Sequence, residues 1–138
     1  MIVADTGAVL ALVDADDRHH RTLRRLFEET GDSWVLPWAI LPEVDYLLMT
    51  HVSQGAEEAF LSDLAAGSYR VEWGSAADLE RAREIAHRHR ALKLGLVDAA
   101  VIAVAERLKA RAIATLDLRH FGVVAIRGRP QLLPRDLE

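Results

Sequence analysis

Two aspartates that follow short apolar segments are the first candidates for chemistry in this sequence. Asp5 comes directly after the run 2–4, and Asp117 comes shortly after the run 112–114. Both runs have the length and composition of buried β-strands. In a parallel sheet the carboxyl ends of the strands share one edge, so the two carboxylates can meet there.

Two further acids stand near the starts of predicted helices. Asp98 is the one charged residue of the stretch 95–105, in which the other residues are apolar or small. A helix that is apolar all round is normally buried, and an unpaired charge beside a dry core is costly. Asp98 is therefore either the N-cap of this helix or a ligand for a cation. Glu43 lies near the start of the predicted helix 39–51, at the edge of its apolar side.

Because both helices follow a strand or a loop, we expect Glu43 and Asp98 at the same edge as Asp5 and Asp117. Four carboxylates gathered there would repel one another and could not all ionise without a cation. Oxygen ligands of this kind suit Mg²⁺ or Mn²⁺, and such an ion can activate a water molecule for attack on a phosphodiester. Thr115 adds a hydroxyl that can orient an acid. The four acids therefore predict a divalent-metal site.

The apolar pattern predicts the elements that must position these acids. We expect strands at 2–4, 34–36, 69–73, 112–114 and 123–126, and helices at 8–13, 18–30, 39–51, 55–66, 75–90 and 96–109. Asp17 is expected to cap the helix 18–30. The alternation is typical of an α/β fold, with helices on both faces of a parallel sheet of about five strands. The length suits one domain, residues 1–138.

Composition limits the classes of partner and compartment. The formal net charge of −4 does not favour nucleic acid, so any such binding requires a local patch or metal ions at the acidic site. The sequence has no cysteine, which excludes disulfides, thiolate metal sites and cysteine nucleophiles. No signal peptide opens the sequence, and no apolar run is long enough to span a membrane. These features predict a soluble cytoplasmic protein.

Basic residues offer candidate contacts with the phosphates of RNA. Arg18 and Arg21 belong to the basic face of the predicted helix 18–30, for which a solvated surface is an equally good interpretation. Arg119 and His120 follow Asp117 and would lie at the acidic edge, as a phosphate clamp or as part of a surface turn.

Two tryptophans, Trp34 and Trp38, flank Pro37. We interpret them as contacts within the core or a dimer rather than as stacking platforms for bases. Tyr46 and Met49 belong either to the core or to an apolar surface for a partner helix.

Four motifs in order carry a resemblance to a known family. The sequence resembles a PIN-domain ribonuclease, and more narrowly the VapC toxins of bacterial toxin–antitoxin pairs, over essentially its whole length. The motifs occupy residues 3–12, 42–44, 97–103 and 114–121. The resemblance implies cleavage of RNA by a Mg²⁺- or Mn²⁺-dependent endonuclease, a homodimer, and inhibition by a cognate antitoxin.

The resemblance also assigns roles to residues. The acidic quartet of the family falls on Asp5, Glu43, Asp98 and Asp117, and Thr115 supplies the supporting hydroxyl. Gly7 stands where many relatives carry serine or threonine, which leaves Thr6 to supply a hydroxyl there. Arg119 and His120 are basic where relatives often have a further polar or acidic residue, so a fifth acidic ligand is not expected.

Two other functions remain open at this point. A PIN-like nuclease outside a toxin pair, acting in RNA processing or on DNA flaps, would use the same acids. A non-catalytic module that binds RNA or protein would keep the fold and tolerate loss of the acids. The triplet 5–7 is also the signature of aspartic proteases, but that chemistry needs a β-rich fold, which the alternation of strands and helices excludes.

Overall fold

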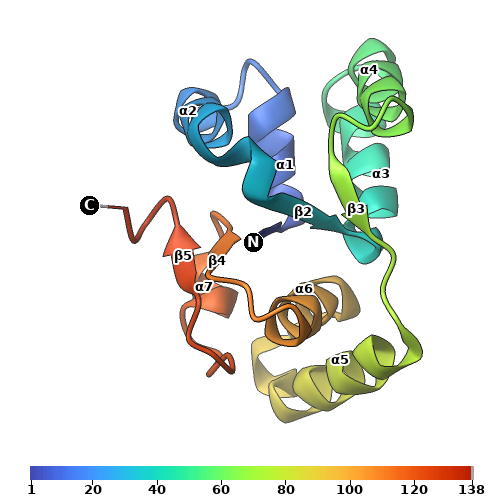
Figure 1. Ribbon diagram of the computed structural model, residues 1–138. Coiled ribbons are helices and arrows are strands. Elements are labelled where there is room, and N and C mark those ends of the chain that lie inside the picture. Colours follow the sequence, from blue (N-terminus) through green and yellow to red (C-terminus); the bar gives the residue numbers. More distant parts are fainter. Residues whose placement is uncertain (138) are drawn as a thin grey trace.

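The computed structural model describes residues 1–137, within which five parallel strands form one sheet in the order β3-β2-β1-β4-β5 (Figure 1). In the central pairings, Ile2 lies opposite Trp34 on one side and Ala112 on the other. All five carboxyl ends therefore lie at one edge of the sheet. The strands are β1 (Ile2–Ala4), β2 (Trp34–Pro37), β3 (Arg70–Glu72), β4 (Ala112–Ala114) and β5 (Gln131–Leu133).

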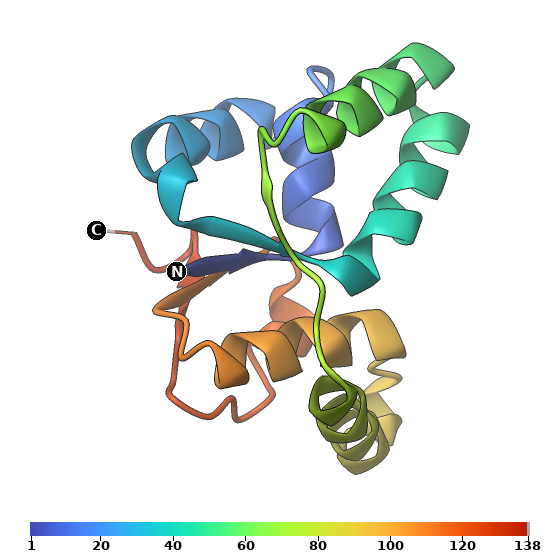
Figure 2. The ribbon, with the colours of Figure 1, turned by 45° about the vertical axis from the view of Figure 1, so that its right-hand side comes forward.

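Helices cover both faces of the sheet, as predicted. Figure 2 shows α1 to α4 on one face, and α5 and α6 on the other. Short 3-10 turns at Gly31–Ser33, Trp38–Ile40 and Arg90–Leu92 connect some of the elements. The helices are α1 (Thr6–Val13), α2 (His20–Thr30), α3 (Leu41–His51), α4 (Gln54–Ala65), α5 (Ala76–Arg88), α6 (Leu96–Arg107) and α7 (Leu118–Phe121).

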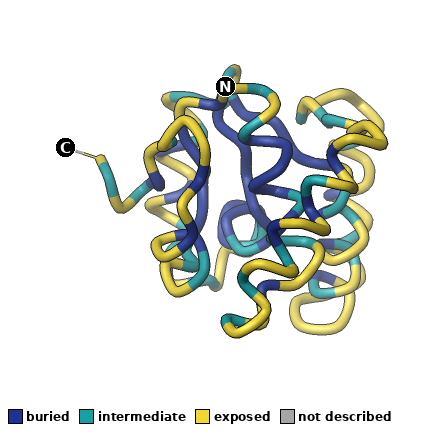
Figure 3. Tube along the Cα trace, turned by 90° about the horizontal axis from the view of Figure 1, so that it is seen from below, coloured by how far each residue is buried: buried dark blue, intermediate teal, exposed yellow. Residues whose placement is uncertain are grey.

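The core lies around the central strands, which are buried along their whole length (Figure 3). A strand covered on both faces must be apolar throughout, which explains the unbroken runs at β1 and β4. Trp34 is 2% exposed and packs edge-to-face against Phe27, with ring centroids 5.1 Å apart, which confirms its place in the core. Among the described residues, no helix is long and apolar enough to cross a membrane.

The predicted strand at 123–126 is wrong. The fifth strand is Gln131–Leu133, which pairs with β4 so that Ala112 lies opposite Gln131. The segment 123–126 is irregular, although Val124 and Ile126 are buried. Alternating apolar residues cover the core equally well from a loop, and the free edge of β4 is occupied by the later segment.

Several predicted helix ends differ from the structure, and local contacts or backbone conformation explain two of the differences. The second helix begins at His20 rather than at Arg18, and the side chain of Asp17 accepts a hydrogen bond from the backbone N–H of His19 (2.7 Å) instead of capping the helix. The central helix ends at Arg107, because Lys109 adopts a left-handed backbone conformation with φ of 51°.

Candidate active site

Asp5 is held rigidly at the carboxyl end of the central strand. Its side chain is the N-cap of α1 and accepts a hydrogen bond from the backbone N–H of Ala8 (2.8 Å). The other carboxylate oxygen accepts a hydrogen bond from the hydroxyl of Thr115 (2.5 Å). Burial raises the pKa of Asp5 to about 7, although these hydrogen bonds oppose the shift. A carboxylate this buried is expensive to ionise unless a cation lies nearby.

Thr115 also connects Asp5 to Asp117. The Thr115 oxygen accepts a hydrogen bond from the backbone N–H of Asp117 (3.0 Å), while its hydroxyl hydrogen is donated to Asp5. Asp117 in turn caps α7 by accepting a hydrogen bond from the backbone N–H of His120 (3.2 Å). One hydroxyl thus holds the carboxylate of Asp5 and the backbone of Asp117, while the backbone N–H of His120 holds the carboxylate of Asp117.

Asp98 is not the N-cap of α6. That position is held by Gly95, without a side-chain cap, and Asp98 lies inside the first turn of the helix. A carboxylate there benefits from the partial positive charge at the helix N-terminus. Its side chain is a quarter exposed and points toward the loop after β4. Of the two interpretations drawn from the sequence, the N-cap is wrong.

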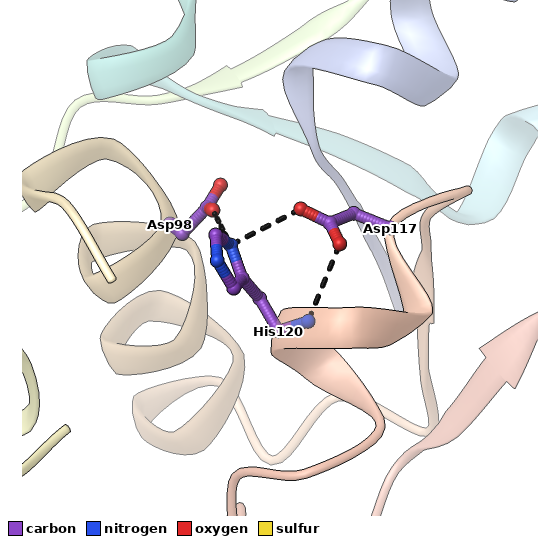
Figure 4. A group of neighbouring side chains, drawn as sticks. All are labelled: Asp98, Asp117 and His120. Carbon is purple, nitrogen blue, oxygen red and sulfur yellow. Dashed lines mark hydrogen bonds and ion pairs between the residues drawn. The ribbon is translucent and has the colours of Figure 1, made fainter. Parts of the chain in front are cut away.

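His120 lies between two of the acids (Figure 4). Its Nδ1 is 2.9 Å from Asp98 Oδ2 and 3.1 Å from Asp117 Oδ2, while its Nε2 is 3.2 Å from the carbonyl oxygen of Leu92. Both ring nitrogens therefore face acceptors, which favours the charged imidazolium. The hydrogen bond to Asp98 is the main cause of the raised pKa of His120.

The sequence pointed to His120 as a phosphate contact and missed its link between the two acids. Asp117 and His120 are three residues apart, which is the spacing of an N-cap residue and the N3 position of a helix. That spacing was a usable signal for their contact. The partner Asp98 is 22 residues away along the chain, and no local pattern indicates it.

Glu43 completes the acidic group from the first turn of α3, where its side chain is exposed. An open cavity of about 810 Å³ is lined by all four predicted acids, together with apolar residues such as Leu10 and Leu47. Burial is the main cause of the raised pKa of Asp98, and the charges of Asp117 and Glu43 raise it further. The structure therefore brings together the four carboxylates that the sequence singled out.

The predicted basic contacts divide into two groups. Arg119 lines the acidic cavity. Arg21 lines a separate hollow beside α2, with Arg25 and Glu29, and Arg18 is exposed in the loop before α2. Neither Arg18 nor Arg21 lines the acidic cavity.

The residues of the cavity fit a hard divalent cation. Carboxylate oxygens of Asp98 and Asp117 lie within 4.8 Å of each other, close enough to share one ion. The hydroxyl oxygen of Thr6, in the same cavity wall, is buried without a hydrogen-bond partner among residues 1–137. Carboxylate and hydroxyl oxygens are the donors that Mg²⁺ and Mn²⁺ prefer.

Comparisons with known proteins agree with this geometry. The family model described as "PIN domain" matches residues 2–126. This chain belongs to the PIN-domain family. The matched range contains β1 to β4 and all four carboxylates of the cavity. The fifth strand of this PIN-domain protein, Gln131–Leu133, lies beyond it.

Individual relatives place the chain in a narrower group within the PIN-domain family. The chain is 34% identical over 123 residues to Ribonuclease VapC26 of Mycobacterium tuberculosis, a match that covers 89% of this chain and 91% of the relative. It therefore belongs among the VapC-type PIN-domain proteins. A crystal structure of Mycobacterium tuberculosis VapC20, described as a sarcin–ricin loop cleaving toxin, matches with a TM-score of 0.78 and 27% identity over 85% of this chain and 90% of that chain.

A more distant structure shows the same fold. The crystal structure of FitAcB from Neisseria gonorrhoeae matches with a TM-score of 0.63 and 16% identity, over 96% of each chain. At this identity the likeness concerns the fold alone.

Proposed function

We propose that this PIN-domain protein is a metal-dependent endoribonuclease and the toxin of a type II toxin–antitoxin pair. The observation that carries the proposal is one open cavity lined by four carboxylates, in a chain that resembles a VapC ribonuclease over most of its length. Within residues 1–137, His120 is the single cationic side chain that pairs with any of the four. A structural cluster would be neutralised by arginines, so this imbalance favours a functional site.

Each residue has a distinct role in the proposed site. Asp5, Asp98 and Asp117 would hold Mg²⁺ or Mn²⁺, and Glu43 would bind it directly or through water. Such an ion, when bound, activates water for attack on a phosphodiester and stabilises charge on the phosphate. Thr115 fixes the orientation of Asp5 through its hydroxyl. His120 offers its imidazolium to Asp98 and Asp117, so it compensates part of their charge.

The cavity is open to solvent, so a phosphate of RNA can approach the four carboxylates from outside. Arg119 lies in its wall and is the basic residue best placed to contact a phosphate beside the scissile bond. Arg18 and Arg21 would contact only distant parts of a long RNA. Because VapC20 is described as cleaving the sarcin–ricin loop, this loop is the first substrate to test.

The proposal includes the partners and setting of a toxin. We place the protein in the cytoplasm, where it would form a homodimer and be inhibited by a cognate antitoxin. We also propose that residues 1–138 form one domain. The addition of β5 to the sheet beyond the matched range supports this last point.

Cleavage of total cellular RNA by the purified protein with Mn²⁺ or Mg²⁺ tests the proposal. Discrete fragments should appear, and they should vanish with EDTA and in the Asp98→Asn variant. If single-stranded or flapped DNA is cut and RNA is not, the protein is a PIN-like nuclease outside a toxin pair. If folded protein binds RNA with Mn²⁺ present and cuts neither nucleic acid, the chain is a binding module and the nuclease proposal is wrong.

A further inference from the structure

Two exposed tryptophans lie side by side at the same edge of the sheet as the acidic cavity. Trp38 follows β2 and is 50% exposed, so its expected place in the core is wrong. Trp73 follows β3 and is 67% exposed. Their ring centroids are 5.3 Å apart, with an angle of 34° between the ring planes. The register explains the pairing, because Pro37 lies opposite Glu72 and the next residue of each strand is a tryptophan. The ends of two neighbouring parallel strands, β2 and β3 (Figure 1), are thus each followed by an exposed indole, and the two rings pack against each other.

The tryptophans border a hollow of about 350 Å³ between the ends of these strands and helices α5 and α6. Small side chains, Ala39, Ala82 and Ala100, contribute to its walls, which leaves room beside the indoles. Leu96, at the start of α6, lines both this hollow and the acidic cavity. The hollow and the proposed cleavage site are therefore neighbours, with Leu96 in the wall of each.

The charges around the hollow distinguish between a base and a phosphate as its occupant. Arg107 binds both Glu72 (2.6 Å) and Asp78 (2.7 Å), so its charge is already engaged. Within residues 1–137, Glu72 Oε2 accepts no hydrogen bond. A phosphate would find no free cation here, whereas the amino group of a base could donate to this oxygen.

We propose that Trp38 and Trp73 form a stacking platform for an unpaired base of the RNA substrate, near the nucleotide whose phosphate occupies the acidic cavity. This inference rests on the proposed function. Aromatic side chains bind single-stranded nucleic acid by stacking on bases, and this contact tolerates any sequence. The sheet order supports the placement, because Trp38 directly follows β2, Asp5 directly follows β1, and these two strands pair.

A second copy of the chain is the competing occupant. The size of the hollow favours a base, because 350 Å³ lies at the low end of pockets for small ligands, and protein interfaces are broader and flatter. The position of the hollow beside the acidic cavity also favours RNA, since the substrate must reach that cavity in any case.

Quenching of tryptophan fluorescence can report on the two exposed tryptophans without a direct contribution from the buried one. The chain has three, and Trp34 is buried in the core, so bases can quench only Trp38 and Trp73 directly. The probe is a single-stranded polyadenylate oligomer added to wild type in EDTA, which stops metal-dependent cleavage. The variants are Trp73→Leu, Trp73→Phe and Trp38→Leu. Tyr46→Leu is the matched control, because Tyr46 is 60% exposed on α3 and lines neither hollow.

We expect the oligomer to quench wild-type emission and Trp73→Leu to lose most of this quenching. Affinity should fall about 5- to 150-fold in Trp73→Leu and Trp38→Leu, the range for one stacked base. Trp73→Phe should recover part of the lost affinity, and the affinity of Tyr46→Leu should equal that of wild type. In cleavage assays with Mn²⁺, the leucine variants should raise KM more than they lower kcat. Thermal unfolding of each variant checks that it is folded.

Three outcomes would overturn the platform. The first is the absence of quenching in wild type, and the second is wild-type affinity and KM in both folded leucine variants. The third is a wild-type dimer that Trp73→Leu converts to monomers without a change in RNA affinity, which would assign the surface to a second copy. Quenching by RNA in a protein that never cleaves it would support the platform and refute the nuclease.

Discussion

The molecule contains two clusters of carboxylates that differ in how their charge is compensated. Between α5 and α6, Arg81 binds Glu106 through two hydrogen bonds of 2.8 and 3.3 Å, and Arg107 joins Glu72 and Asp78. At the carboxyl edge of the sheet, the four acids of the cavity have His120 as their one cationic partner among the described residues. Arginines compensate the negative charge of the first cluster, whereas His120 alone faces the four carboxylates of the second among the described residues.

This difference separates a structural cluster from a functional one. Arginine forms bidentate contacts with carboxylates and holds helices together, as Arg81 does between α5 and α6. Carboxylates left without such partners raise one another's pKa and destabilise the fold. Burial and the neighbouring acids keep the pKa of Asp5 high, at about 7. The protein tolerates this cost where a bound cation can offset it.

The largest effect we expect comes from Asp98→Asn. This change removes a proposed metal ligand from a site where the remaining acids repel one another, so RNA cleavage should fall by on the order of 10³-fold or more. The folded state should be as stable as wild type or more stable, because one repulsive charge is gone. Initial cleavage rates with Mn²⁺ and thermal unfolding in EDTA measure the two effects. Cleavage at the wild-type rate would refute the mechanism.

The next largest effect we expect is stabilisation of the folded protein by Mn²⁺. A ligand that binds only the folded state stabilises it, by about 2.7 kcal/mol when its free concentration is about 100 times Kd. Mn²⁺ should therefore raise the unfolding temperature of wild type, and EDTA should reverse the rise. Asp98→Asn should lose most of this response. An equal response in both proteins would place the metal elsewhere.

Glu106→Gln makes the same chemical change in the cluster compensated by arginines, and we expect the opposite result. Its side chain is 7% exposed, and loss of the charged contact with Arg81 should lower the free energy of unfolding by about 1–3 kcal/mol. RNA cleavage and the response to Mn²⁺ should stay at wild-type levels. Denaturant unfolding beside the cleavage assay checks this, and a loss of activity in the folded variant would show that the clusters are coupled.

The contribution of Glu106 to stability should decrease as the pH falls. Burial raises the pKa of Glu106, but hydrogen bonds from Arg81 and from the backbone N–H of Arg127 outweigh it, so the pKa lies below its usual range. Stabilisation by Glu106 is therefore present at neutral pH and is lost as the pH falls through that lowered pKa. The difference in unfolding free energy between wild type and Glu106→Gln should shrink on acidification, and a constant difference would contradict the assignment.

The smallest effects are expected for basic residues. Each phosphate contact with single-stranded nucleic acid contributes about 0.7 to the slope of log affinity against log salt. Arg119→Ala should reduce this slope by about that amount, because Arg119 lines the acidic cavity. Arg18→Ala and Arg21→Ala should change it less. Salt titrations of RNA binding measure the slopes, and a larger change in Arg21→Ala would place the RNA path across α2.

Much of the fold could be predicted from local pattern. The apolar runs at β1, β2 and β4 and the turns between the helices are local signals, and they predicted the alternation that makes the sheet parallel. The fifth strand could not be located in this way. Segments 123–126 and 131–133 are both short and contain buried apolar residues, and what distinguishes them is pairing with β4, a contact between distant parts of the chain.

In the candidate site, too, some features follow from local sequence and others from contacts between distant residues. Asp5 and Asp117 follow strands, and Glu43 and Asp98 open helices, so the alternation by itself predicted that the four acids converge, and all four line the cavity. The type of side chain and its place at an element boundary are properties of sequence. For this reason the carboxylates that line the cavity can be named from the sequence alone.

The tertiary structure alone decided which distant side chains touch. His120 reaches Asp98 because α7 folds against the start of α6, and Trp73 lies beside Trp38 because β3 pairs with β2 in one register. Neither contact has a local signature, since each joins residues at least 22 positions apart through packing and hydrogen-bonded pairing. The sequence therefore determined which groups reach the edge of the sheet, and the packing of its elements determined how they are paired there.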